Sequence, residues 1–250
     1  MARYFIRLSY LGARYSGFQI QDNAITIQSE VEKALGIYFR SKIELTGSSR
    51  TDAGVNAHNN YFHFDTDIED EKVLNCAYHV NAILPDDISI KQIFRVKDNA
   101  HCRFDATSRT YKYIIYKHKD PFLQNRGYYY PYPMDVELLN KAASLIKEQT
   151  DFATFSKKHV QVHNFRCEIM ESKWYEEEDR LIYEVTGNRF LRGMVRGLVG
   201  TMLKIGVGKM SLQDFVGVVD GKDQTKADFS VPGYGLYLAQ VKYDEEIHEK

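Results

Sequence analysis

Alternation of apolar and polar side chains from the first residues onward is the feature that most constrains the fold of this chain. Tyr4, Ile6, Leu8 and Tyr10 fall on one face of an extended segment, and the odd-numbered residues 3–9 fall on the other. A period of two residues is typical of a β-strand. We therefore expect the chain to open with a strand of a sheet and not with the apolar core of a signal peptide.

Helical and strand-like patterns then take turns over the first hundred residues. Apolar side chains near helical spacing predict a helix from about residue 26. A strand is predicted over 61–64, a second helix over 70–84 that ends at Pro85, and another strand over 88–96. The order strand, helix, loop, strand, helix, strand suggests an open sheet with helices on one side.

The second half repeats this theme more loosely. We predict a strand over 110–116, a helix over 135–147, a hairpin over 173–186 that turns at 177–179, a long helix over 190–204, a short helix from Ser211 to Gly221 and a last strand over 236–243. No linker rich in Gly, Ser or Pro separates the halves. We expect two α+β lobes, residues 1–100 and 101–250, in tight contact with a cleft between them.

The amino-acid composition indicates the class of protein and the cellular compartment to expect. Apolar residues make up 44% of the 250 residues and charged residues 27%, as in soluble globular proteins. No apolar run reaches membrane-spanning length, so we expect a cytoplasmic protein that does not engage a membrane. Three cysteines, Cys76, Cys102 and Cys167, are odd in number and far apart, which predicts buried, reduced thiols and supports neither disulfides nor a zinc site.

Basic residues are concentrated in two stretches although the net charge is only −1. Residues 103–126 hold six Lys or Arg against two acids, and residues 187–209 hold five against none. Such segregation fits a protein that offers one positive surface to a polyanion. Each of these basic side chains, taken alone, is also consistent with an ordinary solvated surface. Five basic residues without an acid favour a surface that binds a polyanion.

Residues 49–56, SRTDAGVN, place Arg50 and Asp52 two apart in a segment that contains a glycine. Two interpretations are equally good on these residues alone. A carboxylate held in a turn beside a cation is ionised and aimed, as a nucleophile must be. The alternative is a plain Asp-x-Gly turn in which the side chain bonds only its own backbone.

A basic and aromatic strand is predicted at 109–116, where Arg109, Tyr111 and Tyr113 share one face. This combination suits phosphate contact together with stacking on an unpaired base. Strand tyrosines are more often half-buried sheet residues, and for Tyr113 we favour that interpretation.

The predicted long helix carries Arg189, Arg192 and Arg196 at spacing i, i+3, i+7, which would place them on one face. Its three glycines, at 193, 197 and 200, each cost nearly 1 kcal/mol relative to Ala, by the usual scale. We therefore expect another backbone or a ligand to come close to this helix.

Other chemistry finds little support in the sequence. His58 and His63 are five residues apart and have no acidic pair beside them, so we expect them to be loop or strand residues and not metal ligands. The chain has no phosphate-loop motif, no GxGxxG and no GxSxG, which argues against a nucleotide cofactor and a serine nucleophile.

Spaced motifs taken together resemble one family, the TruA-type tRNA pseudouridine synthases, almost from end to end. Residues 9–21, SYLGARYSGFQIQ, are similar to the family pattern YDGTxFxGWQxQ, with Leu11 in place of Asp and Phe18 in place of Trp. The loop RTDAGV at 50–55 matches the catalytic motif, although Ser49 replaces the usual Gly and Asn56 the usual His. The matches continue in order with TIQ at 26–28, RF at 103–104, RTY at 109–111, FLRGMVR at 190–196, VG at 199–200 and GLYL at 235–238.

The resemblance implies a fold and a function. The fold would be the α+β pseudouridine synthase fold, with two lobes that each have a mainly antiparallel sheet and helices on one side. The enzyme would work as a homodimer without metal or organic cofactor, and would isomerise uridines at tRNA positions 38, 39 and 40, in the anticodon stem-loop. The departures at positions 11, 18, 49 and 56 bear on which substrates such a site accepts.

The resemblance also implies roles for individual residues. Asp52 would be the nucleophile, Arg50 and Arg196 its electrostatic neighbours, and Tyr111 the active-site tyrosine. Substrate-binding residues are expected at Arg109, Arg192, Arg103, Tyr10 and Gln19.

Two other functions compete with this one. A non-catalytic tRNA-binding protein or chaperone of the same fold is conceivable because the loop is altered, but the presence of both Arg50 and Asp52 argues against it. A metal-dependent nuclease that uses Asp52 and His58 lacks the clustered acids that hard cations prefer.

Overall fold

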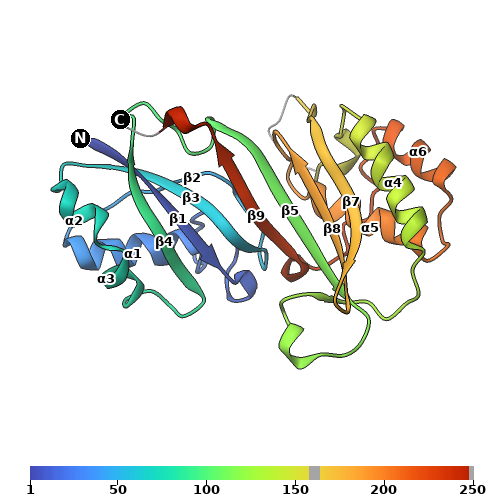
Figure 1. The fold of residues 1–250 in the computed structure, drawn as a ribbon, viewed down its shortest axis with the longest axis horizontal. Helices are drawn as coiled ribbons and strands as arrows, with labels where there is room; N and C mark the ends of the chain where they lie inside the picture. Colours follow the sequence, from blue (N-terminus) through green and yellow to red (C-terminus); the bar gives the residue numbers. More distant parts are fainter. Residues whose placement is uncertain (158–163, 248–250) are drawn as a thin grey trace. The chain divides into compact units, whose positions relative to one another are not determined.

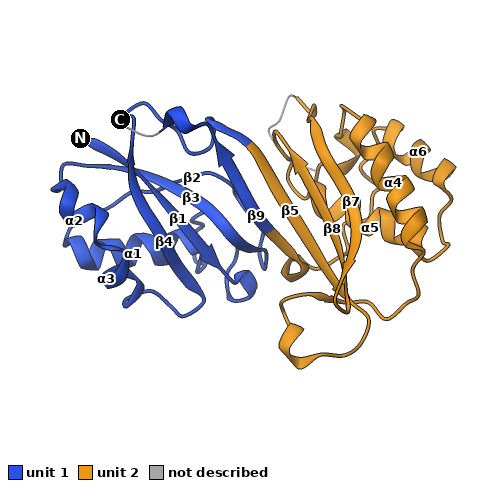
Figure 2. Cartoon of the chain, viewed as in Figure 1, with its two compact units in different colours: residues 1–107, 238–250 blue, residues 108–237 orange. Residues whose placement is uncertain are grey.

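The computed structural model describes residues 1–157 and 164–247, and it divides into two compact units (Figure 2). Unit 1 comprises residues 1–107 and 238–250, and unit 2 comprises residues 108–237. The division near the C-terminus falls inside strand β9 (Leu236–Tyr243). Whether residues 1–100 and 101–250 behave as folding domains stays a prediction.

Unit 1 is built on a sheet in the order β4-β1-β3-β9, from β1 (Ala2–Tyr10), β3 (Asn56–Thr66) and β4 (Ile88–Val96) with β9. Strand β1 lies antiparallel to β3 and to β4, and the two-residue strand β2 (Thr46–Gly47) pairs with β3. The predicted strands at both ends of the chain and at 88–96 are confirmed. Alternation in β1 buries Tyr4, Ile6, Leu8 and Tyr10, as expected.

Helix α1 (Ile27–Phe39) confirms the first predicted helix and begins at a capping box. The Thr26 side chain accepts a hydrogen bond from the Ser29 backbone N–H, and the Ser29 side chain accepts one from the Thr26 N–H. Two of the four backbone donors that the first turn leaves without helical partners are satisfied in this way.

The predicted helix over 70–84 is wrong as a continuous element. It is divided into α2 (Asp70–Leu74) and α3 (Ala77–Asn81). Val73, Cys76 and Val80 are all buried, so the helical spacing of apolar residues is retained. The break falls at Asn75 and Cys76, which are both poor helix formers, and the Cys76 N–H bonds the carbonyl of Val73 three residues back, tighter than an α-helix.

Unit 2 contains a sheet in the order β5-β8-β7, from β5 (Ala106–Tyr116), β8 (Arg180–Gly187) and β7 (Ile169–Glu177). Both pairs are antiparallel, and β6 (Tyr128–Tyr129) adds a short parallel pairing to β5. Helix α4 (Val136–Glu148) lies beside β7 (Figure 1), where the Asn140 amide exchanges two hydrogen bonds with the Trp174 backbone. The predicted hairpin, helix and strand are confirmed in this unit.

Helix α5 (Met194–Gly206) begins four residues later than predicted. Gly193 is its N-cap and has φ +76°, a left-handed conformation that cannot continue a helix. Arg189 and Arg192 therefore precede the helix, and the prediction that they share a helical face with Arg196 is wrong. The short helix α6 (Leu212–Asp220) has the predicted capping box at Ser211 and ends at Gly221.

Short 3-10 helices complete the structure, at Gly12–Arg14, Pro121–Leu123, Ala153–Phe155, Gly233–Gly235 and Glu245–Ile247. The three cysteines are free and buried, as predicted. Burial raises the pKa of the Cys76 and Cys167 thiols to about 11. Among the described residues, no helix combines the length and the apolar character that a membrane crossing requires.

Candidate active site

Asp52 lies in the loop that joins β2 to β3, at the first position of a tight turn. The Val55 N–H donates to the Asp52 carbonyl at 3.2 Å, and Gly54 has φ +78° at the third position. A positive φ at that position is what a type II turn requires and explains the glycine. Thr51 is buried, Asp52 is half-buried and Arg50 is exposed, so the turn offers both charged residues to solvent.

A buried polar network supports this loop from beneath. The Tyr10 hydroxyl lies 2.8 Å from Thr51 Oγ1. The Asn60 side-chain amide donates to the Tyr10 hydroxyl and to the Ser49 carbonyl, both at 3.0 Å. These bonds hold Ser49 and Thr51, the residues on either side of Arg50, in place.

The segment that follows β1 supports the same loop from a second side. The Phe18 N–H donates to the Thr51 carbonyl at 3.1 Å, and the Gly12 N–H donates to Asn56 Oδ1 at 2.8 Å. A Cβ at Gly12 would lie 2.1 Å from the Val55 carbonyl oxygen, so only glycine permits this approach. Asn56, which departs from the family pattern, is thus a buried anchor between the two loops.

The substrate-binding residues expected in unit 1 have different environments. Tyr10 is 3% exposed and its hydroxyl belongs to the network under the loop, whereas Gln19 is exposed next to the Phe18 contact. Arg103 is exposed in the segment after β4, with its guanidinium carbon 5.8 Å from the centre of the Phe104 ring. The binding role of all three residues stays a prediction.

Tyr111 lies on β5 of unit 2, opposite Val185 of β8. Its ring meets the Phe190 ring edge to face, with centroids 5.0 Å apart and planes at 80°. Tyr113, two residues on, is fully buried and donates its hydroxyl proton to the Pro232 carbonyl at 2.8 Å. Tyr113 is therefore a residue of the sheet core, as predicted, and burial raises the pKa of its hydroxyl.

The arginines at 109 and 192 differ in exposure. Arg109 is only 9% exposed and donates from Nη1 to the Asn188 carbonyl at 3.1 Å. Arg192 is exposed, and its own carbonyl accepts a hydrogen bond from the Lys157 N–H at 3.0 Å. A phosphate contact remains a prediction for both, but only Arg192 presents its side chain openly.

Arg196 holds a neighbouring segment against α5. Its Nε donates to the Val231 carbonyl at 2.8 Å and its Nη2 to the Phe229 carbonyl at 3.1 Å. One turn further along the helix, a Cβ at Gly200 would lie 2.2 Å from the Asp228 carbonyl oxygen. The expectation that a backbone approaches this helix closely is confirmed.

The structure groups the predicted residues within each unit. In unit 1 the loop of Arg50 and Asp52 contacts Tyr10 and the segment of Gln19, and in unit 2 Arg109 and Tyr111 contact residues 188–190. Asn60 is the important residue that the sequence analysis missed. The signal for it in the sequence was a polar residue in an alternating series. Residues 60, 62 and 64 share one face of β3 and are all buried, and only residue 60 is polar.

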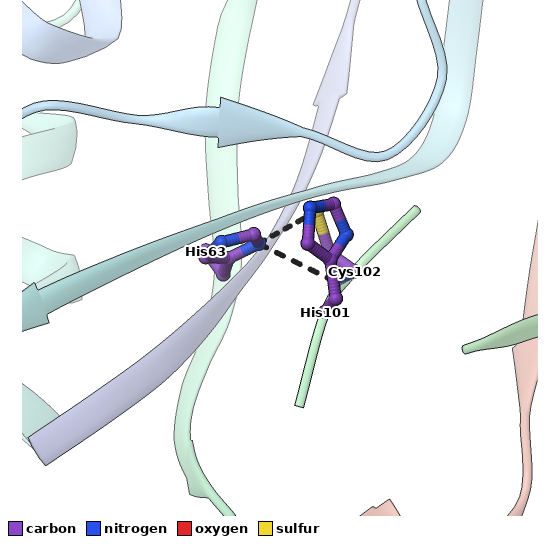
Figure 3. A group of neighbouring side chains, drawn as sticks. All are labelled: His63, His101 and Cys102. Atoms are coloured by element: carbon purple, nitrogen blue, oxygen red, sulfur yellow. Dashed lines mark hydrogen bonds between the residues drawn. The ribbon is translucent and has the colours of Figure 1, made fainter. Parts of the chain in front are cut away.

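One set of three side chains among residues 1–157 and 164–247 has metal-ligand chemistry, and it lies away from the Asp52 turn in sequence. His63, His101 and Cys102 have ligand atoms that all lie within 4.8 Å of one another (Figure 3). Burial, with a contribution from the Arg3 charge, lowers the pKa of His63 to about 4, so that its ring is neutral at physiological pH.

The mostly antiparallel α+β fold, together with an Arg-x-Asp loop between two strands, is consistent with the pseudouridine synthases, isomerases that convert uridine to pseudouridine. Residues 143–244 match the family model described as tRNA pseudouridine synthase. Over 99% of its length the chain is 42% identical to tRNA pseudouridine synthase A of Parabacteroides distasonis and 43% identical to that of Bacteroides fragilis, covering 98% of each. It is 37% identical to tRNA pseudouridine synthase A of Bacillus subtilis, over 95% of this chain and 97% of that protein.

The chain belongs to the tRNA pseudouridine synthase A family. The resemblance seen in the sequence motifs is confirmed, and so are the fold class and the assignment as an isomerase.

Proposed function

We propose that this protein isomerises uridines at positions 38, 39 and 40 of tRNA, in the anticodon stem-loop, as a cytoplasmic homodimer that needs no cofactor. The observation that carries the proposal is the loop at 49–56, where Asp52 and Arg50 reach solvent from a backbone fixed by buried side chains. The names of the similar proteins and the two basic stretches of the chain support tRNA as the substrate.

Asp52 is the nucleophile in this proposal. The reaction breaks the bond between N1 of uracil and C1′ of ribose, turns the freed base, and joins C5 to C1′. A carboxylate assists either by attacking C1′ of the sugar or by adding to the base. A loop that is already rigid loses little entropy when the substrate binds, which favours attack by a correctly placed carboxylate.

Tyr111 is the proposed partner for the base and for its proton. A uridine must leave its stack before reaction, at a cost of a few kcal/mol, and stacking on an aromatic ring offsets part of this cost. The edge-to-face contact with Phe190 fixes the Tyr111 ring. Its hydroxyl is the group proposed to take or relay the proton that C5 loses before the product is complete.

The test is to map pseudouridines in unmodified tRNA transcripts after incubation with the purified protein and, separately, with Asp52→Asn. We expect pseudouridine at one or more of positions 38 to 40 with the wild type and at none with the variant. Binding of tRNA without any pseudouridine would instead support the non-catalytic alternative. Cleavage of the transcript that a chelator abolishes would support the nuclease.

A further inference from the structure

The face of the unit 1 sheet that carries Phe5 also carries a histidine and cysteine cluster that the proposed reaction does not use. His63 lies on β3 next to Phe5, with ring centroids 6.1 Å apart. The segment after β4 covers this face and packs Ala100 and Cys102 against Phe5. Figure 3 shows His63, His101 and Cys102 directed toward one another from two separate segments of the chain.

The geometry of the three side chains is close to that of a metal site. His63 Nδ1 lies 3.1 Å from Cys102 Sγ, and the rings of His63 and His101 are 4.6 Å apart between centroids. Ligand atoms around tetrahedral Zn²⁺ are about 3.3 to 3.8 Å apart, given the usual Zn–N and Zn–S bond lengths. The longest separation in the cluster is within 4.8 Å, so a movement of roughly 1 Å by His101, which lies outside any strand or helix, brings the three atoms into range.

The orientation of His101 is set by its own turn. Its Nδ1 accepts a hydrogen bond from the Arg103 N–H at 3.1 Å, and its backbone N–H donates to Asp105 at 2.7 Å. Because Nδ1 accepts this bond, the ring proton lies on Nε2. Binding of a metal at Nε2 moves that proton to Nδ1 and breaks the hydrogen bond from Arg103.

Two guanidinium groups, those of Arg3 and Arg103, act on the cluster. Arg3 pairs with Asp65 through two hydrogen bonds of 2.7 Å. Asp105 and a Cys102 thiolate would then balance the charge of the ion. One thiolate and two imidazoles suit Zn²⁺, whereas Mg²⁺ and Ca²⁺ prefer oxygen ligands.

We propose that His63, His101 and Cys102 bind one Zn²⁺ ion and thereby tie the segment at 97–105 to strand β3. Binding forms a bond from the metal to Cys102 Sγ, breaks the hydrogen bond of 3.1 Å from that thiol to the Thr46 carbonyl, and releases the thiol proton to solvent. The two imidazoles bind as neutral rings, and His63 Nδ1 gives up the hydrogen bond of 3.3 Å that it accepts from the Cys102 N–H. The fourth position is left to water or to a further ligand.

The ion would also stiffen the base of the Asp52 loop. The Tyr243 hydroxyl donates to the Cys102 carbonyl at 2.5 Å and lies 3.2 Å from Ser48 Oγ, and Ser48 directly precedes the loop at 49–56. This role is structural, so the proposal stands or fails independently of the proposed isomerase activity.

The test is a Co²⁺ titration of the full chain, freed of affinity tags and of bound metal by a chelator that is then removed. Thiolate ligation gives a near-ultraviolet charge-transfer band, and tetrahedral Co²⁺ gives visible bands. We expect both to saturate at one Co²⁺ per chain, to disappear when Zn²⁺ is added, and to persist in excess Mg²⁺. Zn²⁺ should also raise the melting temperature of the wild type, because it binds only the folded state.

Matched variants separate this site from other thiols. Cys102→Ser should lose the charge-transfer band, and Cys167→Ser, which changes a buried cysteine of unit 2, should keep it. Should Cys102→Ser fail to fold by circular dichroism, His101→Ala on the partly exposed segment replaces it and should lose the visible tetrahedral bands. Absence of a band in the wild type, or a band that persists in these variants, overturns the proposal and leaves the cluster as a hydrogen-bonded anchor.

Discussion

The loop of Asp52 in unit 1 and the arginines of unit 2 use polar side chains in opposite ways. In unit 1, the residues proposed for chemistry reach solvent while others, Tyr10 and Asn60, hold their backbone in place. In unit 2, Arg109 and Arg196 themselves donate to backbone carbonyls of neighbouring segments. The proposed chemistry and the structural support thus fall to different residues in unit 1, whereas in unit 2 the arginines proposed for function also provide support.

This difference determines how mutations should be interpreted. A change at Asp52 should abolish the proposed chemistry and change the free energy of unfolding little, because Asp52 is only half-buried and the buried hydrogen bonds of Tyr10 and Asn60 are retained. A change at Arg196 leaves two partly buried carbonyls without their donors, which lowers the free energy of unfolding whatever the role of Arg196 in the reaction. Turnover rates and free energies of unfolding measured on the same variants test this difference between the two units.

The largest effect is expected for Asp52→Asn. The amide keeps the shape of the side chain but has neither charge nor nucleophilicity, so single-turnover pseudouridine formation should fall by about 10⁴ or more. The free energy of unfolding should stay within about 0.5 kcal/mol of wild type, and tRNA affinity should barely change. Asp179→Asn, at an exposed hairpin turn, is the control. Appreciable turnover in Asp52→Asn would remove Asp52 from the chemistry.

Tyr111→Phe separates proton transfer from stacking in unit 2. The variant keeps the ring against Phe190 and loses only the hydroxyl, so we expect single-turnover rates at saturating tRNA to fall by about 10² to 10⁴ with little change in affinity. If the ring matters only for stacking, Phe will be nearly as active, and Tyr111→Ala will cost about 1 to 3 kcal/mol. Tyr175→Phe on β7 serves as the control for loss of a tyrosine hydroxyl.

Arg196→Gln tests whether unit 2 combines support with function. Two hydrogen bonds from a cation to the carbonyls of Val231 and Phe229 are lost, and the free energy of unfolding should fall by about 2 to 3 kcal/mol. Urea titrations of Arg196→Gln and of the exposed Arg192→Gln measure this. Equal stability of the two variants would show that Arg196 is not structural, and that support and proposed function are not combined in this residue.

Tyr10→Phe tests the support of the Asp52 loop. The ring stays in the core, while the bonds to Thr51 and from Asn60 disappear, so we expect a loss of about 1 kcal/mol in stability and of about tenfold in kcat. KM should change little, because the variant shifts the Asp52 loop slightly and removes no group proposed to hold the tRNA. A proportional rise in KM with unchanged kcat would favour direct substrate binding by Tyr10 instead.

The smallest effect is expected for Arg192→Ala. Loss of one phosphate contact should lower the slope of log affinity against log salt by about one unit and leave stability unchanged. Arg109→Ala should also destabilise the protein, because its guanidinium bonds the Asn188 carbonyl. Filter binding over a range of salt concentrations, beside thermal melts, compares the two; an unchanged slope for Arg192→Ala would rule out its phosphate contact.

Local patterns in the sequence were sufficient to predict much of the fold. The strands at 88–96 and 236–243 and the capped helices at 27–39 and 212–220 depend on alternation and on nearby side chains, and both signals are local. The start of α5 was misplaced because apolar spacing continues through Gly193, whose backbone conformation the spacing does not reveal. Helical spacing likewise concealed the break at Asn75 and Cys76.

The site was predicted unevenly for a related reason. Asp52 and Arg50 stand in one short motif, but the support from Asn60 joins residues that are 50 apart in sequence, at Tyr10, and 11 apart, at Ser49. The buried bond of Arg109 to Asn188 spans 79 residues. A pattern of residue types points to the side chains proposed for chemistry, whereas the partners that hold them in place follow from contacts between distant parts of the sequence.

Strand β9 has a consequence for how this protein is made. It lies beside β3 in the sheet, yet residues 108–235 of unit 2 are synthesised between the two strands. During synthesis, β3 of the nascent chain therefore lacks this neighbour until nearly all of unit 2 has emerged. An unpaired edge strand is prone to wrong pairing, so chaperones that shield nascent chains should matter most for this protein in that interval.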